Sequence, residues 1–146
     1  MVLVSCNGPI ETILSNNEKY FGKMIDNETR FDTAYTEGGL NFYYCYSIKN
    51  KTNWSEDETA EFQKKLMEKI LSENLKPRVN LENAEFKVLH DNDYNINFLY
   101  RDFVSGSNLV TIKFNKSVEG YQLDKTTSEW DESVDMFYNK LIVPNK

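Results

Sequence analysis

Apolar and polar residues alternate most regularly in the segment from Leu40 to Ile48. A period of two is typical of a β-strand, because successive side chains point to opposite faces of a sheet. One face would carry Leu40, Phe42, Tyr44, Tyr46 and Ile48, and the other Asn41, Tyr43, Cys45 and Ser47. A strand over 29–35 and the turn Glu37-Gly38-Gly39 precede this segment, so residues 29–48 predict a β-hairpin.

A second hairpin is predicted further along the chain. The segment from Tyr94 to Asp102 alternates in the same way, with Tyr94, Ile96, Phe98 and Tyr100 on one face. Ser105-Gly106-Ser107-Asn108 is typical of a turn, and the segment from Leu109 to Phe114 then alternates again.

Four segments have the spacing of amphipathic helices instead. They are Ile10 to Phe21, Ser55 to about Leu75, Leu81 to His90, and a last helix capped by Ser128 that carries Trp130, Val134, Phe137 and Leu141. The third of these is ambiguous, because Phe86 and Val88 also fit a strand, and its Ala and Glu residues favour the helix. Ser55 and Glu58 form a capping box, and Pro77 is expected to end the second helix.

The resulting order of elements is α-β-β-α-α-β-β-α, which predicts an α+β fold. We expect a mostly antiparallel four-stranded sheet, built from the two hairpins, with the amphipathic helices on one face. At 146 residues the chain is long enough for about one domain, and we assign residues 10–146 to a single globular domain.

Residues 1–9 have a different character. Leu3-Val4-Ser5-Cys6 fits a bacterial lipobox, in which a peptidase cuts before a lipid-modified cysteine, and Asn7-Gly8-Pro9 would follow as a tether. This interpretation places the protein in the bacterial cell envelope, with Cys6 as its lipid attachment and that anchor as its membrane contact. The alternative is a chance match, in which case the protein is cytoplasmic.

The second cysteine, Cys45, alternates within the apolar strand, so it is expected to be a small buried side chain. The sequence does not decide whether Cys6 and Cys45 form a disulfide. With these two cysteines and one histidine, a Cys/His zinc site is not expected, and no cofactor is predicted.

The formal charge is −6, from 23 acidic and 17 basic residues, which argues against nucleic acid as a partner. The expected partner is therefore a protein or a small ligand. A basic protein would complement this charge, although the charge also serves solubility alone.

The densest polar cluster contains Asp26, Thr29, Arg30 and Asp32. Arg30 could clamp a carboxylate or phosphate in a binding groove. The structural alternative is that Asp26 caps a turn and that Arg30 pairs with Asp32 or Asp102. Tyr43, Tyr100 and Asp102 complete the binding candidates, and tyrosine-rich strands can line a pocket or a partner surface.

Catalytic residues are not predicted. His90 is the one candidate for acid–base work near neutral pH, but no G-x-S-x-G, G-x-G-x-x-G or Walker pattern accompanies it. Asp91 and Asp93 lack the glycine and distal glutamate of an EF-hand loop, so a turn explains them better than calcium does.

The segment KMIDNETRFD (23–32), followed by Tyr44-Cys45-Tyr46, resembles a pattern in small exported bacterial proteins of uncharacterised function, V-D-x-x-T-R-x-D followed by Y-x-Y. Phe98-Leu99-Tyr100-Arg101-Asp102, Gly106 and 109–112 are similar to their second hairpin, and the resemblance covers roughly residues 20–115. It implies an exported single-domain protein and supplies no active site.

Three functional hypotheses follow. The first is a non-enzymatic, membrane-tethered binding or interaction domain. The second is an acidic immunity or inhibitor protein that blocks a basic toxin or enzyme, and the third is a small enzyme that uses His90.

Overall fold

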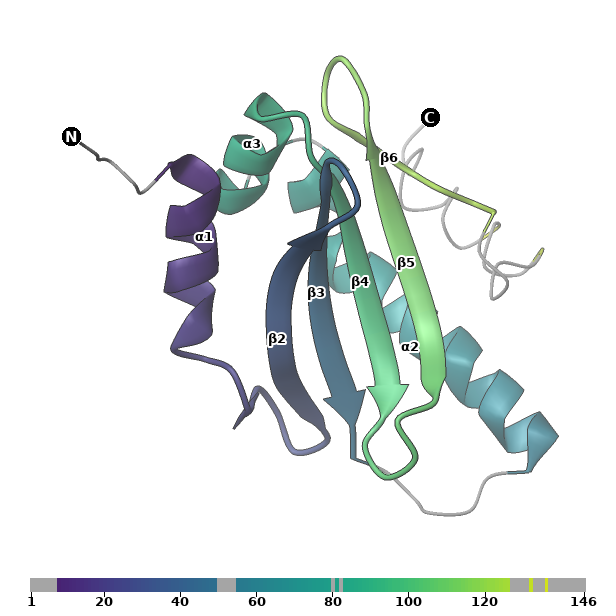
Figure 1. The fold of residues 1–146 in the computed structure, drawn as a ribbon. Helices are drawn as coiled ribbons and strands as arrows, with labels where there is room; N and C mark the ends of the chain where they lie inside the picture. The colour runs from purple at the N-terminus through teal and green to yellow at the C-terminus, as the bar shows by residue number, and fades with distance from the viewer. Residues whose placement is uncertain are drawn as a thin grey trace.

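The computed structural model describes residues 8–49, 55–79, 81, 83–126, 132 and 136. They form an α+β structure with one six-stranded sheet and three helices (Figure 1). The predicted class is therefore correct. The predicted last helix and Cys6 lie outside the described ranges, apart from helical backbone at residues 132 and 136.

The sheet differs from the prediction in size and in one pairing. Its strands follow chain order, β1-β2-β3-β4-β5-β6, and every neighbouring pair is antiparallel except β3 and β4, which are parallel. The strands are β1 (Lys23–Met24), β2 (Thr29–Glu37), β3 (Asn41–Ile48), β4 (Asn95–Asp102), β5 (Asn108–Lys116) and β6 (Tyr121–Leu123). A four-stranded antiparallel sheet is thus wrong in detail, although both predicted hairpins form.

The parallel pairing has a simple cause. The helices α2 (Glu56–Val79) and α3 (Ala84–Asp91) connect β3 to β4 and carry the chain back to the end of the sheet where β3 began. A crossover of this kind makes the two strands run in the same direction, whereas a tight turn would make them antiparallel.

α2 begins at the capping box that the sequence indicates, whereas α3 begins at Ala84, three residues after the predicted Leu81. Glu58 N–H donates to Ser55 Oγ, and Ser55 N–H donates to Glu58 Oε1, both at 3.1 Å, so the capping box at the start of α2 is confirmed. Pro77 does not end α2, which continues to Val79. A proline in the last turn removes one backbone donor, but the next residues can keep helical angles.

α1 (Pro9–Glu18) is shorter than predicted, and the chain after it turns to form β1. In Figure 1, α2 passes behind the sheet, while α1 and α3 lie towards the β2 side. The core lies between the sheet and these helices: Phe42, Phe98, Ile112 and Phe114 of the sheet pack with Ile13, Met67 and Leu89 of the helices.

We call the face of the sheet that packs against the helices the helix face. The opposite face carries Tyr35, Tyr43, Cys45 and Arg101, because these residues alternate with the core side chains. We call it the open face, since the described helices pack on the other side. Leu40, predicted to share the apolar face, lies before β3 and is exposed.

Candidate ligand pocket and arginine cluster

A pocket of about 400 Å³ opens on the helix face, between α1, the turn into β1, the sheet and α3. Six aromatic residues line it: Tyr20, Phe31, Tyr44, Tyr46, Phe86 and Phe98. The remaining lining residues are Asn17, Lys23, Met24, Ile25 and Glu85. We call this cavity the aromatic pocket. Its volume and its mostly apolar lining with a few polar groups are typical of small-molecule sites.

The aromatic wall comes from alternate positions of neighbouring strands. The Tyr44 ring stacks on Phe98 with centroids 5.1 Å apart, and Phe86 of α3 meets both rings edge-on. Phe31 of β2 lies against Tyr46, with centroids 5.2 Å apart. These packed rings are fixed by the core, so the inner wall is preformed.

Glu85 is the acidic residue of this pocket, and the start of α3 positions it. The Asn83 side chain caps the helix by accepting from Phe86 N–H at 3.1 Å, which sets Glu85 in the first turn. Its carboxylate accepts hydrogen bonds from the Tyr44 hydroxyl and from Asn17 Nδ2 of α1. Glu85 therefore joins α1, α3 and β3 at the pocket.

The mouth of the pocket is apolar and exposed. Tyr20, Met24 and Ile25 are 51%, 44% and 58% exposed, respectively. They belong to the segment that leaves α1 and forms the two-residue β1. A small ligand could therefore reach the aromatic wall from solvent.

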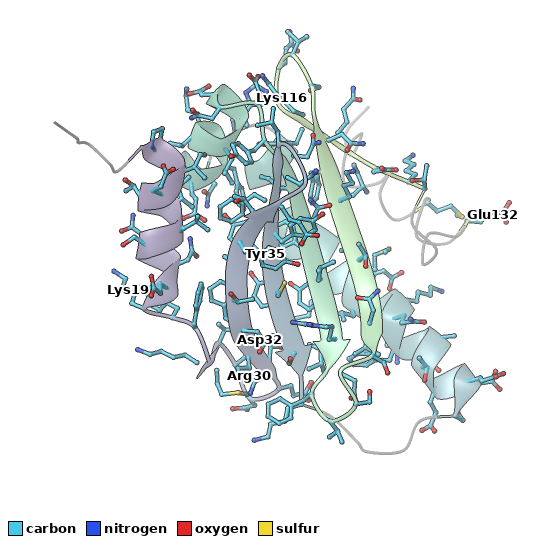
Figure 2. The ribbon with its side chains drawn as sticks, in the orientation of Figure 1. Lys19, Arg30, Asp32, Tyr35, Lys116 and Glu132 are labelled. Atoms are coloured by element: carbon cyan, nitrogen blue, oxygen red, sulfur yellow. The ribbon has the colours of Figure 1, made fainter. Side chains whose placement is uncertain are left out.

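Two residues of the predicted polar cluster, Arg30 and Asp32, meet on the open face. A bulge in β2 gives Asp32 no partner in β3, because Phe31 pairs with Tyr46 and Thr33 already pairs with Cys45. Arg30 Nε donates to Asp32 Oδ1 at 2.6 Å, and the Ser47 hydroxyl donates to Asp32 Oδ2. The predicted pairing of Arg30 with Asp32 is confirmed, and Figure 2 shows both along β2.

Arg101 joins the same cluster, with Nη2 3.8 Å from Asp32 Oδ2. The guanidinium of Arg30 also lies over the Phe103 ring, 4.4 Å from its centroid. We call Arg30, Asp32, Ser47 and Arg101 the arginine cluster. The sequence analysis missed Arg101, because this residue reaches the cluster only through its position opposite Ser47 in the parallel register of β3 and β4.

Asp26 is not part of this cluster. Its Oδ1 accepts from the N–H groups of Glu28 and Thr29 at 2.8 and 2.7 Å, so it caps the turn before β2 as the structural alternative proposed. Burial raises the pKa of its carboxyl, but these two backbone hydrogen bonds and the nearby Lys69 outweigh burial and leave the pKa below its usual value.

Tyr43 lies on the open face and stacks on Tyr35, with ring centroids 4.9 Å apart. Cys45 is a buried thiol that forms no disulfide with another described residue, and Cys6, its possible partner, lies outside the described ranges. Burial raises the pKa of the Cys45 thiol and outweighs the nearby Arg101 and the Tyr35 hydrogen bond, which lower it. Burial also raises the pKa of Tyr35, whose hydroxyl is hydrogen-bonded with Cys45.

Tyr100 and Asp102 are buried and lie away from the arginine cluster's contacts. Tyr100 stacks on Tyr46, with centroids 4.7 Å apart, on the helix face. Asp102 Oδ2 accepts from the N–H and the hydroxyl of Ser105, both at 2.8 Å, which closes the turn between β4 and β5. These two residues thus serve packing and a turn in this structure.

His90 is buried on α3, with Nε2 2.7 Å from the Ser117 carbonyl oxygen and its ring edge-on to Tyr121. It does not line the aromatic pocket, so the geometry gives the enzyme hypothesis no support at this residue. Asp91 and Asp93 pair instead with Lys87 and Lys116. Across the residues the structure describes, no three His, Cys, Asp or Glu side chains gather as metal ligands.

Comparison with known proteins gives one relevant fold. The sequence matches no family model and no curated protein. A solved structure named as a "putative secreted protein" from Pseudomonas aeruginosa is similar, with a TM-score of 0.54 and 13% sequence identity. The match covers 73% of this chain and 85% of that one. At this identity the likeness establishes a shared fold and leaves the function open.

Proposed function

We propose that this protein is a non-enzymatic binding domain of the bacterial cell envelope, and that it holds a small ligand in the aromatic pocket. The observation that carries the proposal is the pocket itself: about 400 Å³, walled by packed aromatic rings and open to solvent at an apolar mouth. Such a site is the default binding site of a protein of unknown activity.

The proposed location rests on separate support. Leu3-Val4-Ser5-Cys6 fits a lipobox, and the fold is shared with the Pseudomonas aeruginosa protein that is named as a secreted one. No helix in the described part of the chain is long and apolar enough to cross a bilayer. We therefore propose Cys6 as the membrane attachment.

The pocket can be tested by NMR with a library of small molecules. We expect binders to shift the amide signals of residues on its walls, such as Tyr44, Tyr46 and Phe86. Binders that shift only open-face residues, such as Tyr43 and Arg101, would favour the arginine cluster as the site. A library with no binder at the pocket would count against the proposal.

The anchor can be tested by metabolic labelling of the native gene product with a palmitate analogue. Cys6→Ser should abolish the label and release the protein from the membrane fraction. Cys45→Ala is the matched control, because Cys45 is a buried thiol within β3, and it should keep the label. A wild-type protein without label would overturn the anchor.

A protein partner on the open face is a second candidate. The stacked pair Tyr35 and Tyr43 lies on the same face as the half-buried Arg101, and tyrosine and arginine are enriched among residues that dominate protein interfaces. In the immunity-protein hypothesis this face would contact the target enzyme through its tyrosine pair. Tyr43→Ala should then abolish capture of that enzyme, whereas a pocket ligand should bind this variant normally.

A further inference from the structure

Glu85 has an unusual position for a carboxylate. It is half-buried in a wall of aromatic rings, and its two oxygens accept from neutral donors, the Tyr44 hydroxyl and the Asn17 amide. Within the described ranges, no lysine or arginine forms an ion pair with it. Protein carboxylates withdrawn from water are normally paired with a cation, and the described residues supply no such cation to Glu85.

The Glu85 carboxylate can accept more hydrogen bonds than the two that it receives from Tyr44 and Asn17. An ionised carboxyl group has about four lone-pair sites, and the neutral donors occupy two of them. The faces of tyrosine and phenylalanine rings also carry partial negative charge, which attracts a cation. The aromatic pocket therefore combines a carboxyl group with an aromatic wall.

The structural role of Glu85 does not require that charge. Joining α1, α3 and β3 needs hydrogen bonds to Tyr44 and Asn17, which a neutral glutamine could also make. Lys23 is the one cation of the pocket lining, but it is exposed at the mouth, where water and salt screen its charge. The half-buried Glu85 is screened less.

We propose that the aromatic pocket binds an organic cation, with an ammonium group against Glu85 and an apolar body against the aromatic wall. This proposal rests on the proposed function and specifies its ligand class. A pocket of about 400 Å³ accommodates an amine with a ring or a short chain attached. The charge of the amine would be neutralised by Glu85, and its methylene groups would be removed from water.

Three matched probes test the charge preference: phenylbutylamine, phenylbutanol and phenylpentanoate, which present a cation, a neutral hydroxyl and an anion on the same body. We expect the amine to bind about tenfold more tightly than the alcohol, and the anion to bind most weakly. A trimethylammonium form of the amine shows whether a primary or quaternary cation is preferred. Affinities would be measured by calorimetry and mapped by NMR.

Glu85→Gln provides the decisive variant. We expect it to lose about tenfold in affinity for the amine relative to the alcohol, so that the preference for the cation disappears. Glu18→Gln is the matched control: it makes the same change of charge on an exposed residue of α1 that does not line the pocket, and it should bind all probes normally.

A salt titration of the wild type keeps the test independent of the folding of Glu85→Gln. Affinity for the amine should fall as ionic strength rises, and affinity for the alcohol should not. Equal affinity for amine and alcohol at the pocket would overturn the cation proposal and leave the pocket as a binding site. Absence of all probes from the pocket would overturn both proposals.

Discussion

Asp32 and Asp102 are two aspartates whose carboxylates have opposite electrostatic environments. Asp32 is bonded by Arg30 and Ser47 and lies near Arg101, so its charge is compensated. Asp102 is 7% exposed, and its Oδ1 is buried without a hydrogen-bond partner. No described lysine or arginine forms an ion pair with it. Such a charge is a local cost to stability.

We therefore expect Asp102→Asn to be as stable as the wild type or more stable, by up to about 1 kcal/mol, because the amide keeps an oxygen for Ser105 and removes the buried charge. Asp102→Ala should lose about 1–2 kcal/mol, because the Ser105 N–H loses its acceptor. Urea denaturation measures both.

Asp91→Asn is the matched control, since Asp91 is exposed and pairs with Lys87 at the surface. Exposed pairs of this kind contribute little, so its free energy of unfolding should change by less than about 0.5 kcal/mol. If Asp102→Asn were clearly less stable than the wild type, the Oδ1 atom would have a favourable role that the observed contacts do not contain.

At the scale of elements, the start of α2 offers a direct test of the capping box. Ser55→Ala removes the acceptor of the Glu58 N–H and should reduce the free energy of unfolding by about 1 kcal/mol. Thermal or urea unfolding followed by circular dichroism measures the loss.

Ser72→Ala makes the same substitution inside α2, at an exposed residue whose hydroxyl donates to the Lys69 carbonyl oxygen three residues earlier. Alanine favours helix more than serine does, so this variant should be as stable as the wild type or slightly more stable. Equal losses in both variants would show that the cap at Ser55 has no special role.

The elements that the sequence predicted correctly are those with several periods of their pattern. β3 and β4 each have eight residues, enough for clear alternation, and α2 has 24 residues that follow a capping box. β1 and β6, with two and three residues, are too short to show any period. The parallel pairing was missed because local patterns do not record which strands meet after a crossover.

The candidate sites follow the same division. Arg30 and Asp32 are two residues apart, so their pairing could be predicted from sequence, whereas Arg101 reaches them only through the register of β3 and β4. The aromatic pocket draws on α1, β1, the sheet and α3. Glu85 stood in a predicted helix, but nothing in the sequence placed Tyr44 and Asn17 beside it.

At the scale of the whole molecule, groups on both faces of the sheet make stability depend on pH. Hydrogen bonding by Lys116 lowers the pKa of Asp93, and hydrogen bonding by Thr126 lowers that of Asp124. A carboxyl group whose pKa is lower in the folded state stabilises the fold above its unfolded pKa of about 4. This stabilisation is lost as pH falls. Burial raises the pKa values of Tyr35, Cys45 and Tyr121, which act at alkaline pH.

For Tyr35, Cys45 and Tyr121 the change of stability with pH has the opposite sign. The unfolded thiol and phenols ionise above about pH 9 and 10, while the folded protein still holds their protons. The unfolded state then binds fewer protons than the folded state, so the free energy of unfolding falls as pH rises. We expect a stability plateau from about pH 5 to about pH 8.5, with a decline on either side.

Tyr121 tests the alkaline side, because it is almost fully buried and its hydroxyl donates to the Tyr94 carbonyl oxygen at 2.7 Å. Tyr121→Phe should lose about 1 kcal/mol near neutral pH through that hydrogen bond, yet decline less steeply than the wild type above about pH 10. Tyr20→Phe, at an exposed tyrosine, should follow the wild-type curve throughout. Urea midpoints across this range measure the difference. Parallel curves for Tyr121→Phe and the wild type would mean that the other groups, Tyr35 and Cys45, account for the alkaline loss.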